Sequence, residues 1–173
     1  VTGRWHHEEV TEPGVGEFFA RFTSLEFNSA QNPRVAYQGD TLSGTGLKYA
    51  EWNPLTSQWE VSVIDATPSS GGWPCLELDS ADQAHIVYYV PPPNEPKLRY
   101  AYQNLGGWFI EGIPYTTTAV PEDFSMALVH SVMYPDCILG VSFLRGDGWL
   151  CYQLRRFEGW LESPRLAAGE GEY

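Results

Sequence analysis

The chain has 173 residues, 43% of them apolar, so it is long enough for one domain with a buried core and too apolar to be disordered overall. Its formal net charge of −12 repels the phosphates of nucleic acids and of anionic lipids, and we expect neither nucleic acid nor a membrane as a partner. The chain combines 7 Trp, 10 Tyr and 8 Phe with 17 Gly and 13 Pro, and no window keeps apolar residues at helical spacing for three turns. We therefore predict an all-β protein.

One sequence pattern occurs three times. The run "LEFNSAQNPRVAYQ" at 25–38 returns 51 residues later as "LELDSADQAHIVYY" at 76–89, and its apolar positions and serine return in "ALVHSVMYPDCILG" at 127–140. Each repeat contains four segments of strand character. They span 24–29, 33–39, 46–52 and 58–65, then 75–80, 84–90, 97–103 and 107–113, then 125–131, 136–143, 149–155 and 159–164.

The strands and turns of the three repeats share further features. Every third segment has an aliphatic residue followed two positions later by Tyr, and every fourth segment opens with Trp59, Trp108 or Trp160. The first loop of each repeat is short and polar, and the second is rich in Gly or Pro, which is typical of hairpin turns. Four antiparallel strands per 40–50 residues is the pattern of propeller blades. We predict a single propeller-type domain, 1–173, with blades at about 22–65, 73–113 and 124–166.

The run "CLELDSADQAHIVYY…LRYAYQN…GWFIEGI" resembles bacterial β-propeller repeats of the form S-L-x-L-D-x-x-x-x-P-H-I-x-Y-Y, then L-x-Y-A, then W-x-x-E. The resemblance covers about 24–163, and it is weakest in the third repeat, which lacks the acidic turn residue. It implies four-stranded blades around an axis and no particular activity. The sequence boxes of sialidase, WD40 and kelch propellers are missing.

The number of repeats poses a problem of closure. Residues 3–11, "GRWHHEEVT", look like a fourth strand without its first three, an orphan outer strand. Three blades cannot close a ring, because propellers use about 4–8 blades. Three solutions are open. Two chains could form a homodimer of six blades, which we favour; the chain could be part of a longer propeller; or 3–11 could complete the third blade if 159–166 is not a strand.

Two sets of repeated residues are candidates for a ligand site. Phe22, Trp73 and Phe124 precede the first strands at a spacing of 51 and either line one mouth of a central channel or wedge between neighbouring blades. Glu26 and Glu77 share one position on the innermost strands. They could bind a cation or act as a catalytic pair, but a three-residue loop would also place them opposite Arg34 and His85 as cross-strand pairs, the alternative that we favour.

We expect a non-catalytic, lectin-like binding module that presents its inter-blade loops to a carbohydrate or protein partner after self-association. The predicted binding residues are Phe22, Trp73, Phe124, Tyr115, Glu26 and Glu77, on or beside loops that meet at one end of the blades. A glycosidase or lyase that uses channel carboxylates and a purely structural assembly unit are the alternatives. We expect no cofactor and no metal, because the histidines show no zinc-type spacing.

Overall fold

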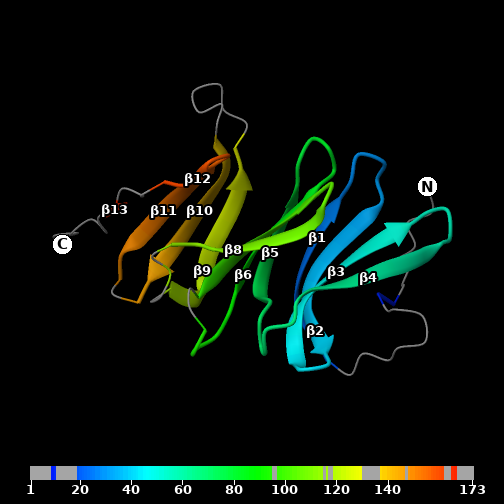
Figure 1. Ribbon diagram of the computed structural model, residues 1–173, viewed down its shortest axis with the longest axis horizontal. Helices are drawn as coiled ribbons and strands as arrows, with labels where there is room; N and C mark the ends of the chain where they lie inside the picture. Colours follow the sequence, from blue (N-terminus) through cyan, green and yellow to red (C-terminus); the bar gives the residue numbers. More distant parts are fainter. Residues whose placement is uncertain are drawn as a thin grey trace, which may run out of the picture.

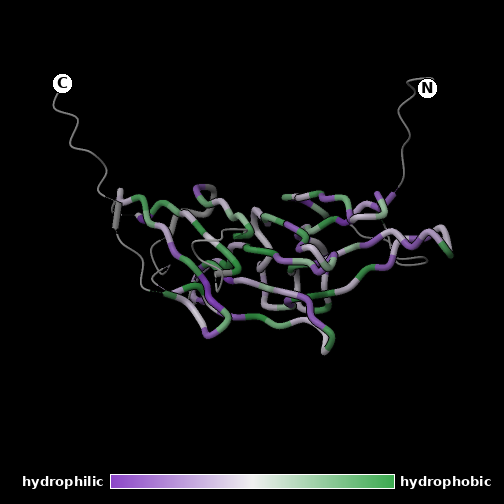
Figure 2. Tube along the Cα trace, turned by 90° about the horizontal axis from the view of Figure 1, so that it is seen from above, coloured by the Kyte–Doolittle hydropathy of each residue, from purple (hydrophilic) through white to green (hydrophobic). Residues whose placement is uncertain are grey.

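The protein is all-β in a computed structural model, which describes residues 9–10, 19–94, 97–114, 116, 119–129, 137–146, 148–161 and 165–166. These residues form three antiparallel sheets and contain no helix (Figure 1). The sheets follow one another in chain order, the first at the right of Figure 1 and the third at the left. The described strands do not close into a ring, and the view from above in Figure 2 shows the same open row.

Each sheet corresponds to one sequence repeat. The first has the order β1 (Ala20–Phe27), β2 (Pro33–Thr41), β3 (Gly44–Asn53), β4 (Gln58–Asp65). The second has the order β5 (Gly72–Leu78), β6 (Ala84–Tyr89), β7 (Leu98–Asn104), β8 (Gly107–Gly112). The third runs β9 (Ala119–Leu128), β10 (Cys137–Arg145), β11 (Leu150–Arg156), β12 (Gly159–Trp160), and β13 (Arg165–Leu166) also pairs with β11. The strands predicted for the three repeats are thus confirmed in order, with two short strands, β12 and β13, in the place of the last.

The repeat extends to the backbone of the first turn in each of the first two sheets. The side chain of Asn28 accepts hydrogen bonds from the N–H groups of Ala30 and Asn32 at 3.1 and 2.8 Å. In the second sheet Asp79 accepts the equivalent two bonds, both at 2.8 Å. This self-bonded turn, which Asn and Asp side chains favour, fixes the pairing register of the strands that follow.

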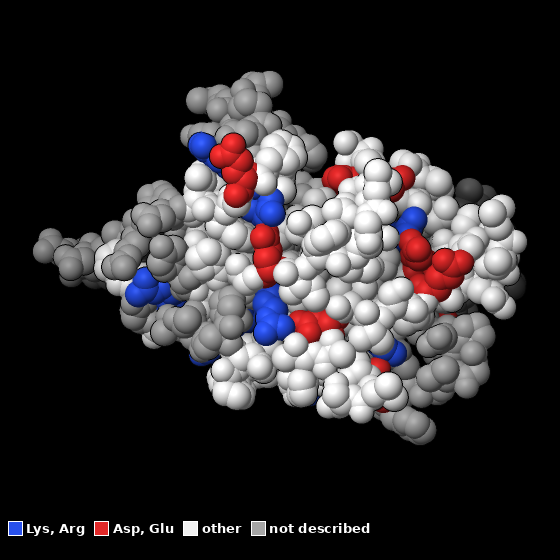
Figure 3. Space-filling view, in the orientation of Figure 1, with Lys and Arg blue, Asp and Glu red and all other residues white. Residues whose placement is uncertain are grey.

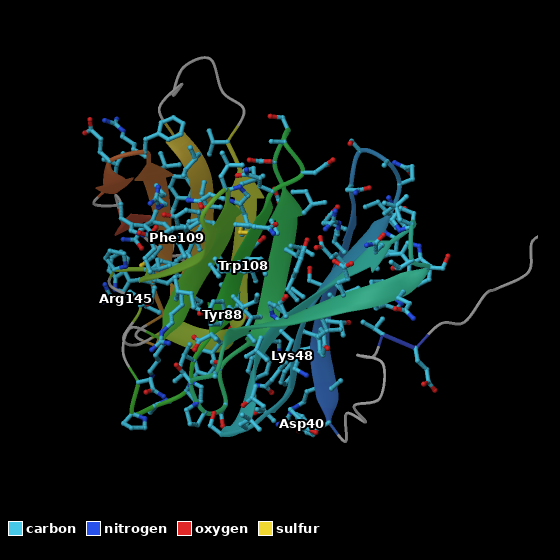
Figure 4. All side chains as sticks on the ribbon, turned by 45° about the vertical axis from the view of Figure 1, so that its right-hand side comes forward. Asp40, Lys48, Tyr88, Trp108, Phe109 and Arg145 are labelled. Atoms are coloured by element: carbon cyan, nitrogen blue, oxygen red, sulfur yellow. The ribbon has the colours of Figure 1, made fainter. Side chains whose placement is uncertain are left out.

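Neighbouring sheets pack through one repeated aromatic contact. The ring of Tyr49 on β3 meets Trp108 on β8 edge to face, with centroids 5.0 Å apart, and Tyr100 on β7 meets Trp160 in the same way at 6.0 Å. In each case the Tyr belongs to the third strand of one sheet and the Trp to the outer strand of the next. Figure 4 labels Trp108 beside Phe109 on β8; as successive strand residues they face the first and the third sheet respectively.

A buried charge network also joins the first sheet to the second. The carboxylate of Asp65, at the end of β4, accepts hydrogen bonds from the hydroxyl of Tyr88 at 2.7 Å and from Arg99 at 2.9 Å. Burial alone would raise the pKa of Asp65, but bonds from Thr67, Tyr88 and Arg99 outweigh burial and hold this pKa below its usual value. Asp65 is therefore ionised at neutral pH, and it fixes the second sheet against the first.

The outer edge of the third sheet is occupied by short pieces of chain. Residues 159–160 pair with Arg155 and Arg156, and 165–166 pair with Leu150 and Cys151. Residues 159–160 and 165–166 therefore occupy the place of the predicted fourth strand beside β11. Of the predicted orphan strand 3–11 only residues 9 and 10 are described; they belong to no strand, and Val10 packs on the first sheet against a cluster that contains Val35, Tyr37, Ala50 and Trp59.

One core position of the third sheet is occupied by a polar side chain, and its replacement is expected to stabilise the protein. Gln153 is fully buried and stands where the first two repeats have Ala50 and Ala101, and neither atom of its amide has a partner among the described residues. A buried unpaired amide costs roughly 1–3 kcal/mol, so Gln153→Met should raise the free energy of unfolding by about 1–2 kcal/mol in urea denaturation. The exposed Gln58→Met is the control. A fall in stability would mean that the amide is satisfied.

A cleft between the second and third sheets

A cleft of about 440 Å³ opens between the second and third sheets, at the end where the first turn of each repeat lies. The second sheet supplies its aromatic wall and most of its polar groups, and the third supplies apolar residues and one arginine. The lining consists of Asp79, Ser80, Gln83, His85, Tyr100, Tyr102, Gln103, Asn104, Leu128, Val129, Ile138, Arg155 and Phe157. A concave space of this size with a few convergent polar groups is typical of small-ligand sites.

The wall of the cleft is a row of rings that crosses three strands of the second sheet. His85 on β6 is stacked on Tyr100 with centroids 5.9 Å apart, and Tyr100 is stacked on Tyr102 at 5.1 Å. Tyr102 is in turn stacked on Phe109 of β8 at 5.5 Å. The rings share one face of the sheet because His85 is paired with Tyr102, and Tyr102 with Phe109, across neighbouring strands.

A chain of polar contacts orients the histidine in this wall. The Nδ1 atom of His85 and the hydroxyl of Tyr100 share a hydrogen bond of 2.5 Å, and the Nε2 atom lies 3.6 Å from the carboxylate of Asp79. Burial lowers the pKa of His85, although Asp79 acts in the opposite direction. The imidazole is thus neutral at pH 7. Its Nε2 atom is buried and has no hydrogen-bond partner among the described residues, and His85 is one of the residues that line the cleft.

Arg155 of the third sheet reaches across to the same wall. Its guanidinium lies over the rings of Tyr100 and Tyr102, 5.7 and 5.4 Å from their centroids, and pairs with Glu111 of β8. Burial disfavours the charge, but Glu111 outweighs burial and raises the pKa of Arg155. Because Glu111 neutralises this cation and Asp79 adds a negative charge, the cleft has no surplus of positive charge to bind an anion.

The equivalent place between the first and second sheets holds charged and hydrogen-bonded residues instead of the row of rings. There Arg34 takes the place of His85 and forms an ion pair with Glu51, which takes the place of Tyr102. The turns are also joined, since Asp82 accepts bonds from the N–H and the hydroxyl of Ser29 at 2.8 and 2.6 Å. An ion pair thus stands at the first junction, where uncharged rings line the open cleft at the second.

Comparison with family models, curated proteins and solved structures gave no match. The described residues contain no group of three or more His, Cys, Asp or Glu side chains placed to hold a metal ion. Among these residues there is also no helix long and apolar enough to span a membrane. In Figure 3 most of the described part of the visible face is uncharged; acidic and basic side chains lie next to one another in a few places, and there is no large basic patch.

The structure places two of the predicted aromatic residues together at the opposite end of the sheets. The rings of Phe22 and Trp73 are 4.2 Å apart and line a smaller pocket of about 240 Å³ together with Arg21 and Gln38. Phe22 has a φ of 53° and Trp73 a φ of 46°, and each lies at the corresponding bulge in the first strand of its own sheet. They bridge the first and second sheets, which supports the interpretation that these rings wedge between neighbouring sheets.

The other predicted site residues do not join that pocket. Phe124 packs against the apolar cluster between the second and third sheets, and Tyr115 lies outside the described residues. Glu26 and Glu77 stand opposite Arg34 and His85, as the cross-strand alternative predicts. The carboxylate of Glu77 accepts a hydrogen bond of 2.9 Å from the backbone N–H of Leu128, so it joins the first strands of two sheets, β5 and β9.

Proposed function

We propose that the chain is a non-catalytic, propeller-type binding module whose sheets are blades and whose cleft between the second and third sheets binds a carbohydrate. One observation carries the proposal: where the first junction has the ion pair Arg34–Glu51, the second has His85 and Tyr102 beside an open space of about 440 Å³. The binding site is thus assigned to the turns at the opposite end of the blades from the inter-blade loops favoured by the sequence.

The chemistry of the lining favours a sugar over other ligands. The C–H face of a sugar ring packs on aromatic side chains, and its hydroxyls bond to carboxylate and amide groups such as those of Asp79, Gln83 and Asn104. The pairing of Arg155 with Glu111 argues against an anionic ligand. A cleft of this size suits a small molecule better than a folded protein partner.

Catalysis by channel carboxylates has less support. Glu77 is engaged by the backbone of Leu128, and the hydroxyl of Tyr100 is poorly suited to be a general base, since burial raises the pKa of Tyr100 well above its usual value. His85 and Tyr100 therefore act better as a rigid support for the exposed part of the wall.

Tyr102→Ala should weaken binding of the best oligosaccharide from a glycan array by about tenfold or more, as measured by isothermal titration calorimetry. Tyr102 is half-buried, so Gln83→Ala, which changes another residue of the cleft lining, serves as a second variant that leaves the core intact. Phe22→Ala in the smaller pocket is the matched control. If Phe22→Ala loses binding while Tyr102→Ala keeps the affinity of the wild type, the site lies at the other end of the sheets. A glycan array that shows no bound oligosaccharide would contradict the proposal.

A further inference from the structure

The two outermost sheets each present an apolar residue at a position that is covered elsewhere in the same chain. Leu25 on β1 is 52% exposed, whereas Leu76, its equivalent in the second sheet, is 3% exposed because the first sheet covers it. On the other side of the molecule Leu150 is 45% exposed, whereas the equivalent Leu47 and Leu98 are both 0% exposed. Leu25 and Leu150 are therefore the two sides of a sheet-to-sheet contact that the chain already forms twice inside itself.

The internal junctions show how the halves fit together. Leu47 of the first sheet and Leu76 of the second belong to one apolar cluster. Leu98 of the second sheet belongs to another cluster with Met126, which takes the corresponding place on the innermost strand of the third sheet. Both junctions therefore have the same composition. A leucine near the start of the third strand of one sheet shares an apolar cluster with a residue on the first strand of the following sheet.

The outward face of the third sheet retains the features of such a junction. Leu150 and Tyr152 point away from the second sheet, because Cys151 between them is buried in the cluster shared with it. Tyr152 stands where Tyr49 and Tyr100 stand, and its ring lies over Gly140, whose added Cβ would come within 3.2 Å of that ring. Leu150 also lines a shallow hollow with Ser125, Ser142 and Leu144.

The outward face of the first sheet is the matching half. Trp59 occupies the position that Trp108 and Trp160 occupy in the internal junctions, on the same face as Val35 and Tyr37. Val10 packs against this central cluster, while Leu25 and Phe27 on the innermost strand remain 52% and 53% exposed. The uncovered part of this face is therefore the part that would receive Leu150.

We propose that the outward face of the third sheet docks on the outward face of the first sheet of a second copy, with Leu150 against Leu25. Because each chain carries both halves, two chains form two identical contacts and close a ring of six sheets. Known propellers have about 4–8 blades. The six sheets of two copies fall inside this range, and the nine sheets of three copies fall outside it. The inference shares the blade arrangement with the proposed function but is independent of the ligand.

Sedimentation equilibrium of the full chain tests this contact. The wild type at about 100 μM is expected to have twice the chain mass of 19.4 kDa. Leu25→Asp and Leu150→Asp, both at half-exposed positions, should each raise the dissociation constant at least about 30-fold, since each buries an unpaired charge. Leu105→Asp, at a fully exposed hairpin tip, is the control and should leave the mass unchanged.

A charge pair separates loss of the contact from loss of the fold. The double variant Leu25→Lys/Leu150→Asp faces lysine with aspartate at both contacts, so it should associate more tightly than Leu150→Asp alone. A monomeric wild type, a mass above two chains, or dimers that persist in both single aspartate variants would each overturn the proposal. The carbohydrate titration does not bear on this result, so the two proposals can fail separately.

Discussion

Replacing Asp65 with asparagine is expected to lower the free energy of unfolding by about 3 kcal/mol, because removal of one member of a buried ion pair leaves the other charge without compensation. The carboxylate is 6% exposed and accepts hydrogen bonds from Tyr88 and Arg99 of the second sheet. Its loss would leave Arg99, whose side chain is 19% exposed, in a site with little access to water. Urea denaturation measures the change.

A second substitution tests whether the uncompensated arginine is the cause. In the Asp65→Asn background, Arg99→Met removes the stranded charge and keeps the length of the side chain, so part of the lost stability should return. Asp123→Asn, at an exposed position, should change the stability by less than about 0.5 kcal/mol. A cost below about 1 kcal/mol for Asp65→Asn would show that the network is not a main link between the sheets.

The same carboxylate predicts the direction of the pH dependence. The pKa of Asp65 is lower in the folded protein than its unfolded value of about 3.9. Its contribution is therefore complete above about pH 4 and is lost as the pH falls through the folded pKa. The wild type should lose more stability than Asp65→Asn in this acid range, and parallel pH profiles of the two proteins would contradict the assignment.

The strands could be predicted because their signals are local. Alternation of side chains and turn residues such as Asn28 and Asp79 act over a few positions, and the structure uses them in the way that the sequence indicates. The same local reasoning placed Glu26 opposite Arg34 correctly. It missed the partner of the ion pair, because Arg34 also stands opposite Glu51 on β3 and pairs with that residue.

The cleft was missed because it depends on how the repeats differ. A comparison of Arg34 with His85 and of Glu51 with Tyr102 would have shown charged residues replaced by rings at one junction, and this signal was present in the sequence. The contribution of Arg155 was not readable, because it depends on how closely the third sheet approaches the second. Distances between sheets are set by packing and by the connecting segments, and no short sequence window contains them.

The connection from the first sheet to the second has little room for any side chain. Gly71 has φ of +85°, and an added Cβ would come within 2.7 Å of the Cα and 2.8 Å of the N of Leu47. The neighbouring Ser70 donates a hydrogen bond of 2.9 Å to the carbonyl of Asp65, and Gln38 donates to the carbonyls of Ser69 and Ser70 at 2.9 and 2.8 Å. The connection therefore cannot move away to make space.

Gly71→Ala is expected to cost more than about 3 kcal/mol in urea denaturation, since backbone strain at positive φ adds to a clash with backbone atoms. Gly44→Ala is the matched control: Gly44 also has positive φ, +128°, but an added Cβ meets nothing within 4 Å, so only the backbone strain of about 1–2 kcal/mol applies. The difference between the two variants measures how firmly the connection is held against β3. Equal costs would mean that the connection yields, and that the contacts between Asp65, Tyr88 and Arg99 alone set the position of the second sheet.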